Sequence, residues 1–317
     1  MGSRHSVMAN SSSRFLSPTL VFSRTSFLLT ARPARVSLFH HRHRCCCTAS
    51  PSNAAPAATE ASLTNEQEGL KLIRSPHLVA MEYADLNLTD KFSEELGHVR
   101  IRQHVNPLRS SLMVPAEVPD WSMVYKDATL PLMVDIGCGS GRFLMWLAQR
   151  TPNSKNYLGL EIRQKLVDRA KYWVCELALS NIHFIFANAM VSFKQLVSTY
   201  PGPLMLVSIL CPDPHFKKRH HKRRVVQKPL VESIVDSLVP GGQVFIQSDV
   251  LEVANDMRGH FDAESDKLLH INYIEPNMLC DDDGWLLNNP MGIRTEREIH
   301  AEFEGSRIYR RLYQKQL

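Results

Sequence analysis

The chain has 317 residues with 37 Lys and Arg against 32 Asp and Glu, which gives a formal net charge of +5. Residues 1–59 carry this excess, because they contain seven Arg and no Asp, Glu or Lys, and removing those seven leaves 30 cations against 32 anions. The rest of the chain is therefore not a generally basic protein, and no apolar run in it approaches the length of a transmembrane helix.

Residues 1–59 have the composition of an organellar transit peptide with a linker, since they are rich in Arg and Ser and lack acids. We expect them to be disordered; the alternative is a disordered tail without a targeting role. Residues 60–99 form a less regular N-terminal extension, and residues 100–317 are long enough to bury the core of one α/β domain. The cysteines of this domain show no CxxC spacing, which argues against a disulfide framework or a structural zinc site.

Apolar strand-like runs alternate with amphipathic helix patterns from Leu132 onward. The predicted strands are 132–135, 156–162, 182–186, 204–210 and 243–247. The predicted helices are 142–150, 163–179, 192–199, 228–238 and 251–261, and the Pro-Gly-Gly at 240–242 follows the fourth. Repeated strand–helix units of this length indicate an α/β fold with a parallel sheet and helices on both faces.

A glycine-rich turn joins the first predicted strand to the first helix, with Asp135, Gly137, Gly139 and Gly141 at alternate positions. Glycines there let the chain turn sharply and let a ligand approach the backbone. In a dinucleotide fingerprint the third glycine would come one residue later than it does here. A cationic sulfonium cofactor has no phosphate to bind, and the acidic Asp135 suits it better than a diphosphate.

Two polar residues follow the next two strands at the same edge of the predicted sheet. Glu161 ends the second strand, where a carboxylate accepts the hydroxyls of a ribose in NAD or in S-adenosyl-L-methionine. Asn188 follows the third strand, where it can reach an adenine edge. Together with the glycine turn they predict a pocket for an adenosyl cofactor, with a methyl donor favoured over NAD.

The fourth strand leads into Asp213, which is flanked by prolines, and then into six cations within residues 217–224. Such a carboxylate is often only a turn former, and an isolated charged run is often only a solvated surface. Ligands bind beyond the carboxyl ends of the strands in open α/β sheets, so the combination suggests chemistry on a nucleic-acid base with Arg223 and Arg224 contacting phosphates. No metal is expected, since Cys211 and the neighbouring histidines lack ligand spacing and the cations would repel a divalent ion.

Four motifs resemble the tRNA (guanine-N7-)-methyltransferase family. They are Asp-Ile-Gly-Cys-Gly-Ser-Gly at 135–141, Gly-Leu-Glu-Ile-Arg at 159–163, the run at 212–227 that begins with Pro-Asp-Pro-His-Phe-Lys-Lys-Arg, and Gln-Ser-Asp-Val at 247–250. Thr-Glu-Arg-Glu at 295–298 also matches, and the resemblance covers about residues 95–317. It implies a Rossmann-like class I methyltransferase with a mostly parallel seven-stranded sheet. The implied reaction transfers a methyl group from S-adenosyl-L-methionine to N7 of a guanosine in the variable loop of tRNA.

The resemblance also implies roles for individual residues. Asp213 would be catalytic. The cofactor would be bound by Gly137, Gly139, Glu161, Arg163, Asn188, Ala189 and Leu210, with Asp135 close by. The substrate would contact Lys217, Asp249, Thr295 and Glu298, besides the cationic Arg223 and Arg224. Bacterial members of the family often have Asp where Asn188 stands, so that contact can differ in detail.

The motif at 212–227 and Gln247–Val250 look similar to cyanobacterial sequences, which favours a chloroplast enzyme, with the mitochondrion as the alternative. Such an enzyme would act on tRNA as a monomer or weak homodimer without the WD-repeat partner of nuclear-cytoplasmic relatives. Three other functions remain open on the sequence alone: an NAD-dependent oxidoreductase, a non-catalytic RNA-binding protein or tRNA chaperone, and a methyltransferase acting on another RNA.

Overall fold

The computed structural model of the chain describes residues 74–88 and 105–317. The chain divides into two units, residues 1–64 and 65–317. The predicted transit peptide and linker at 1–59 lie outside the described residues, as does most of the extension predicted at 60–99. In the described ranges, no helix has the length and apolar character needed to cross a membrane.

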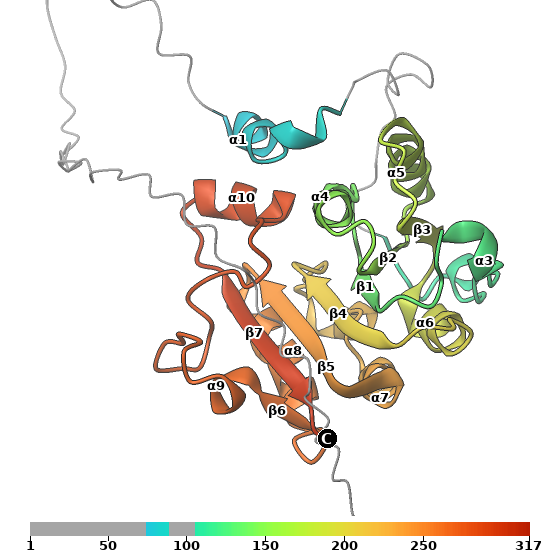
Figure 1. Ribbon diagram of the computed structural model, residues 1–317. Helices are drawn as coiled ribbons and strands as arrows, with labels where there is room; N and C mark the ends of the chain where they lie inside the picture. The colour runs from blue at the N-terminus through green and yellow to red at the C-terminus, as the bar shows by residue number, and fades with distance from the viewer. Residues whose placement is uncertain (1–73, 89–104) are drawn as a thin grey trace, which may run out of the picture. The chain divides into compact units, whose positions relative to one another are not determined.

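A seven-stranded sheet forms the centre of the unit from residue 65 onward (Figure 1). Its strands follow the order β3-β2-β1-β4-β5-β7-β6. Their bounds are β1 Leu132–Ile136, β2 Asn156–Glu161, β3 Ile182–Phe186, β4 Leu204–Leu210, β5 Leu238–Ser248, β6 Leu268–His270 and β7 Tyr309–Lys315. The first five strands pair in parallel, and β7 runs antiparallel to both β5 and β6. The carboxyl ends of β1 to β5 therefore lie at one edge of the sheet.

Helices cover both faces of the sheet. One face packs against α6 Ala189–Ser198, α7 Lys228–Ser237 and α8 Leu251–Asp262, and the other against α4 Arg142–Arg150, α5 Gln164–Glu176 and α10 Glu296–Phe303. The shorter helical elements are α1 Ser75–Glu82, η1 Ala84–Leu86, η2 Ser110–Leu112, α3 Trp121–Val124, η3 Lys218–Arg223 and α9 Ile271–Ile274. This arrangement confirms the predicted α/β architecture with helices on both faces.

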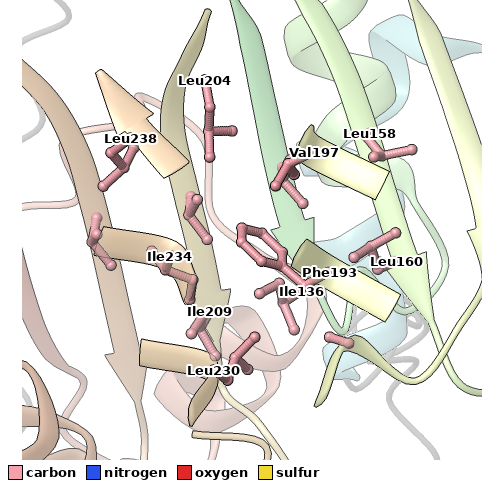
Figure 2. Close-up of a cluster of buried hydrophobic side chains, with 14 of the residues drawn as sticks. Ile136, Leu158, Leu160, Phe193, Val197, Leu204, Ile209, Leu230, Ile234 and Leu238 are labelled. Carbon is pink, nitrogen blue, oxygen red and sulfur yellow. The ribbon is translucent and has the colours of Figure 1, made fainter. Parts of the chain in front are cut away.

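The core on the α6–α7 face is apolar and closely packed (Figure 2). Phe193 of α6 and Ile234 of α7 are almost fully buried in the same cluster as Ile136 of β1 and Ile209 of β4. Burying side chains of this size contributes about 1.5–3 kcal/mol each, which holds the strand ends, and hence the residues that follow them, in fixed positions.

Helix α1 and the residue after it pack against the C-terminal part of the domain. Glu82 forms an ion pair with Arg294, and the hydroxyl of Tyr83 donates to the carbonyl of the same arginine. Val79, Tyr83 and Leu86 are buried in the core on the α4–α5 face. Part of the predicted N-terminal extension is thus a packed component of the domain.

Two predicted elements begin three or more residues away from the observed starts. Helix α6 begins at Ala189 and not at residue 192, because the Asn188 side chain caps it by accepting from the Met190 amide. Strand β5 begins at Leu238, five residues before the predicted strand, since Gly241 adopts a φ of +81° and the ladder with β4 continues past an irregularity at Leu204. A Pro-Gly-Gly sequence normally ends an element, and here it only bends one.

Candidate active site

A pocket opens at the carboxyl ends of β1 to β4, where the sequence predicted one. Its lining comes from the segments that follow each of these strands, together with residues ahead of α3 and after Asp213. The lining residues are Val105, Pro107, Ile136, Gly137, Leu160, Glu161, Ile162, Arg163, Ala187, Asn188, Ala189, Met190, Cys211, Pro212, Asp213, His215, Arg223 and Val225. The predicted catalytic residue and five of the predicted cofactor residues thus share one cavity.

The glycine turn after β1 adopts the conformation that the sequence suggested. Gly137, Gly139 and Gly141 have φ values of +80°, +57° and +81°, a region that residues with a side chain rarely adopt. A Cβ on Gly141 would also lie 2.6 Å from the Phe184 ring. Gly137 lines the pocket, whereas the Gly139 amide points to Glu161, donating to its Oε2 at 3.0 Å. Gly139 therefore orients the Glu161 carboxylate.

Glu161 is the most enclosed charged group of the pocket, with 1% of its surface exposed. Its Oε1 accepts from the backbone amide of Arg163 at 3.0 Å and from that residue's Nη1 at 3.1 Å. Burial raises the pKa of Glu161, while the charge and hydrogen bonds of Arg163 and the Gly139 amide oppose that shift. The carboxylate is thus held in a fixed orientation at the end of β2.

Asp135 lies next to the pocket lining without belonging to it. It is 4% exposed and accepts a hydrogen bond from the Ser208 hydroxyl at 2.7 Å, while the two residues that follow it line the cavity. Burial raises the pKa of Asp135 to about 7, the Ser208 hydrogen bond acts against this, and the charge of Glu161 adds to it. Asp135 therefore supplies a negative field close to the cofactor position only when it is ionised.

We expect the Asp135→Asn variant to change how the stability of the ligand-free protein depends on pH. A carboxyl whose pKa rises on folding, here from 3.8 to about 7, binds more protons in the folded than in the unfolded state, so its contribution to stability falls as pH rises through that window. Relative to wild type, the variant should thus gain stability between about pH 5 and about pH 8. Urea denaturation at both pH values measures this difference, and a constant difference would contradict it.

The three remaining predicted cofactor residues differ in their position relative to the pocket. Asn188 lines the pocket, but its side-chain amide donates to the carbonyls of Pro107 and Leu112 at 3.0 and 3.1 Å and so anchors the segment ahead of α3. Ala189 lines the pocket directly, whereas Leu210 packs into the core on the opposite side of β4. The Asn188 Nδ2 group is therefore occupied by these carbonyls, and a contact with adenine without rearrangement would have to use the amide oxygen, which accepts from the Met190 amide at 3.1 Å.

Asp213 sits in a turn held by unusual backbone geometry. Cys211 and His215, two residues to either side, have φ values of +51° and +45°, which cost roughly 1–3 kcal/mol each in residues other than glycine. Arg163 donates through Nη2 to both oxygens of Asp213 at 3.2 and 3.1 Å. This ion pair joins residues fifty positions apart, so no local pattern in the sequence indicates it.

Arg224 does not lie where a phosphate contact would need it, which corrects the sequence-based expectation. It is 4% exposed, and its Nε donates to the carbonyl of Pro214 at 2.9 Å. Its terminal nitrogens pair with Glu252 at 2.6 Å and Asp256 at 3.3 Å, both on α8. Because its guanidinium binds both the Pro214 carbonyl and two acids of α8, Arg224 links the turn that carries Asp213 to this helix.

The other cations of the 217–224 run are more accessible. Lys217, Lys218, Arg219 and Lys222 are exposed around η3. Arg223 lines the pocket, and within the described part of the chain its Nε has no hydrogen-bond partner. Lys217 is thus exposed to solvent, whereas Arg223 is partly buried and faces the cavity; their predicted contact with the substrate stays a prediction.

The substrate contacts predicted near the C-terminus separate into two groups. Asp249 pairs with Arg297 at 2.6 Å near the surface, and Thr295 caps α10 by accepting from the Glu298 amide. Glu298 is 0% exposed, so a direct substrate contact is contradicted by the structure. Its oxygens pair with Arg310 and accept hydrogen bonds from the side chains of Gln247 and Asn289, so Glu298 stabilises the fold.

No metal centre is present within the described ranges, where no three His, Cys, Asp or Glu residues gather closely enough to hold an ion. Cys211 lines the pocket, but burial and then the charge of Asp249 raise the pKa of its thiol to about 12. Since a thiol acts as a nucleophile only when deprotonated, this shift disfavours the reactive form of Cys211. Besides Cys211, the ionisable groups that line this cavity are the carboxylates of Glu161 and Asp213, the guanidiniums of Arg163 and Arg223, and the imidazole of His215.

The fold and the pocket at the ends of its parallel strands define a Rossmann-like class I methyltransferase. A protein family described as "Putative methyltransferase" matches residues 129–311. A tRNA (guanine-N(7)-)-methyltransferase from Synechococcus sp. (strain JA-2-3B'a(2-13)) is 50% identical over 215 residues, which cover 68% of this chain and 84% of that protein. A protein of the same name from Synechocystis sp. (strain ATCC 27184 / PCC 6803 / Kazusa) is 45% identical over 220 residues, covering 69% and 99%. The chain belongs to the tRNA (guanine-N(7)-)-methyltransferase family.

Among solved structures, an rRNA methylase from Streptococcus thermophilus has a TM-score of 0.38 and 14% identity, covering 62% of this chain and 92% of that one. This likeness is too weak to bear on the site, so the family assignment rests on the sequence relatives.

Proposed function

We propose that this protein transfers a methyl group from S-adenosyl-L-methionine to N7 of a guanosine in tRNA, and that this guanosine lies in the variable loop. The observation that carries the proposal is the pocket that brings Glu161 and Asp213 together through Arg163 in a member of this family. A methyltransferase needs its cofactor and its acceptor base side by side, and these two carboxylates follow different strands at the same sheet edge.

The residues of the pocket suit S-adenosyl-L-methionine. Glu161 can accept ribose hydroxyls, and the carboxylates of Asp135 and Asp213 favour a cationic ligand over a diphosphate. When bound, this cofactor supplies an electrophilic methyl group on a positively charged sulfur.

Guanine N7 carries a free lone pair, so no base has to remove a proton before attack. The new N7–carbon bond forms as the sulfur–carbon bond breaks, and the positive charge passes to the guanine. In this proposal Asp213 accepts hydrogen bonds from the N1–H and N2–H edge of the guanine and stabilises the developing positive charge through its own negative charge. It therefore orients and polarises the base, and in-line positioning supplies much of the remaining rate enhancement.

The exposed cations around η3 form the proposed tRNA surface. Next to them, Phe216 is 67% exposed and offers an aromatic face for stacking on an unpaired base. Lysines at these positions bind phosphates without reading sequence, so the choice of one guanosine depends on the shape of the tRNA.

Replacing both Lys217 and Lys218 by Glu should weaken tRNA binding and reduce its dependence on salt. Each phosphate that the protein no longer neutralises lowers the slope of log affinity against log salt by roughly 0.7–0.9, so the slope of the double variant should fall by about 1.5. Filter binding between about 50 and 200 mM salt measures this slope. Lys194→Glu, an exposed charge reversal on α6, serves as the control; an unchanged slope in the double variant would place the RNA elsewhere.

We further propose a chloroplast location, with the mitochondrion as the alternative, and action as a monomer or weak homodimer without an obligate protein partner. The acid-free, Arg- and Ser-rich composition of residues 1–59 and the similarity to cyanobacterial proteins support the location. Fusing residues 1–59 to a fluorescent protein tests it, and a diffuse cytosolic signal would count against it.

The reaction itself is tested with the full-length protein, total tRNA and methyl-labelled S-adenosyl-L-methionine. After digestion to nucleosides, the proposal expects label in 7-methylguanosine, and mapping of the labelled tRNA should place it in the variable loop. Label in another nucleoside would keep the methyltransferase and discard the target. Bound cofactor without any label would favour a binding role.

A further inference from the structure

Arg163 is the shared partner of the two carboxylates that define the pocket. Its Nη1 donates to Glu161 at 3.1 Å, and its Nη2 donates to both oxygens of Asp213 at 3.1 and 3.2 Å. Under the proposed function, Glu161 belongs to the cofactor end of the pocket and Asp213 to the acceptor end. One guanidinium therefore contacts both ends directly.

The hydrogen bonds of Glu161 leave too few acceptor positions for a ribose. A carboxylate oxygen accepts about two hydrogen bonds. Oε1 already accepts from the backbone amide and the Nη1 of Arg163, whereas Oε2 accepts from the amide of Gly139. Oε2 can therefore accept one further hydrogen bond, whereas Oε1 has no free acceptor position. Two adjacent hydroxyls that bind one to each oxygen require one of the present donors to leave Oε1.

The donor that can give way is the Arg163 side chain. The amide of Gly139 is fixed within the glycine turn, and the amide of Arg163 is fixed at the start of α5. The guanidinium, by contrast, sits on a rotatable side chain and already has a second anionic partner in Asp213. Leaving Glu161 thus does not leave this cation unpaired.

We propose that a vicinal diol on Glu161 displaces Nη1 of Arg163, so that the guanidinium leaves Glu161 and keeps its ion pair with Asp213. The proposal rests on the proposed function in one respect: the diol is the ribose of the methyl donor. Asp213, whose side chain is 33% exposed, is then held in its working orientation once the cofactor is bound. Arg163 is a positioning residue that links cofactor binding to the acceptor site.

Such a link must act in both directions, because the coupling between two sites is reciprocal. Asp213 favours the displaced position of Arg163 and so assists binding at Glu161. Without the charge of Asp213, the ion pair with Glu161 becomes more favourable relative to the displaced position of the guanidinium, so a diol that breaks this ion pair binds less tightly. Removing a residue at the acceptor end should therefore weaken binding at the cofactor end.

Calorimetric binding of S-adenosylhomocysteine to full-length variants tests this coupling without needing turnover. Asp213→Asn should raise the Kd roughly five- to fiftyfold in the wild-type background, and by less than about twofold in an Arg163→Met background. Lys165→Met removes an exposed cation two residues away and should keep the full response to Asp213→Asn. Arg163→Lys retains the charge but cannot reach both carboxylates, so it should also abolish the response if Arg163→Met fails to fold.

A 2′,3′-dideoxy analogue of S-adenosylhomocysteine provides the second arm. It needs no position on Oε1, so Asp213→Asn should not change its affinity in any background. Equal effects of Asp213→Asn with and without Arg163 would overturn the coupling while leaving the methyl transfer intact. A wild-type protein that binds no S-adenosylhomocysteine would overturn both the coupling and the proposed function.

Discussion

Replacing Asp213 by Asn is expected to lower the rate of methyl transfer to tRNA about 10²–10³-fold at saturating cofactor and tRNA. The asparagine keeps the size of the side chain but removes the negative charge that faces the developing guanine cation. It also removes the anionic partner of Arg163 at this end of the pocket, so the orientation of the turn is less fixed. Saturating conditions separate this loss from the weaker cofactor binding expected of the same variant.

The measurement is incorporation of labelled methyl into 7-methylguanosine under single-turnover conditions. Asp168→Asn provides a matched control, since Asp168 is an exposed carboxylate on α5 that accepts a hydrogen bond from the nearby Gln164. Thermal melting should show that both variants fold. A fully active Asp213→Asn would refute the electrostatic role.

Replacing Glu298 by Ala is expected to destabilise the protein by about 3–5 kcal/mol, because one partner of a buried ion pair is removed and the other is left uncompensated. The stranded cation is Arg310, which is itself buried and has Glu302 at 3.4 Å as its other acid. Gln247 and Asn289 lose their acceptor as well, at 3.1 and 3.0 Å. Urea denaturation measures the resulting drop in the free energy of unfolding.

Two neighbouring variants calibrate this result. Thr295→Ala removes the cap of α10 and should cost only about 1 kcal/mol. Glu304→Ala removes an exposed acid at the opposite, C-terminal end of α10 and should be close to neutral. If Glu298→Ala kept wild-type stability and instead raised the KM for tRNA, Glu298 would be a substrate contact after all.

The sequence was sufficient to predict the parallel strands and the side chains at their ends. Strands β3 and β4 match the predicted bounds, because buried strands are short apolar runs whose limits are visible locally. Gly137, Glu161 and Asp213 then follow from the rule that ligands bind beyond the carboxyl ends of such strands.

The residues that were misplaced are charged groups whose partners are distant in the sequence. Arg224 lies among exposed cations, and only the position of α8 shows that Glu252 and Asp256 enclose it. Glu298 has the spacing of a capping box, but its burial depends on Arg310 in β7. The neighbouring sequence gives the charge of such a residue but not its exposure to solvent. Its burial depends on helices and strands that come later in the chain and pack against it.

The attachment of Arg224 to Pro214 and α8 has a consequence for how this enzyme can change. It holds the turn that carries Asp213 against α8, while the neighbouring lysines remain in solvent. An enzyme that must release a large polyanion after each reaction can therefore gain or lose surface charge here without disturbing its chemistry. Substitutions at the exposed lysines can therefore change the affinity for the nucleic acid, and with it the rate of product release, independently of the methyl-transfer step.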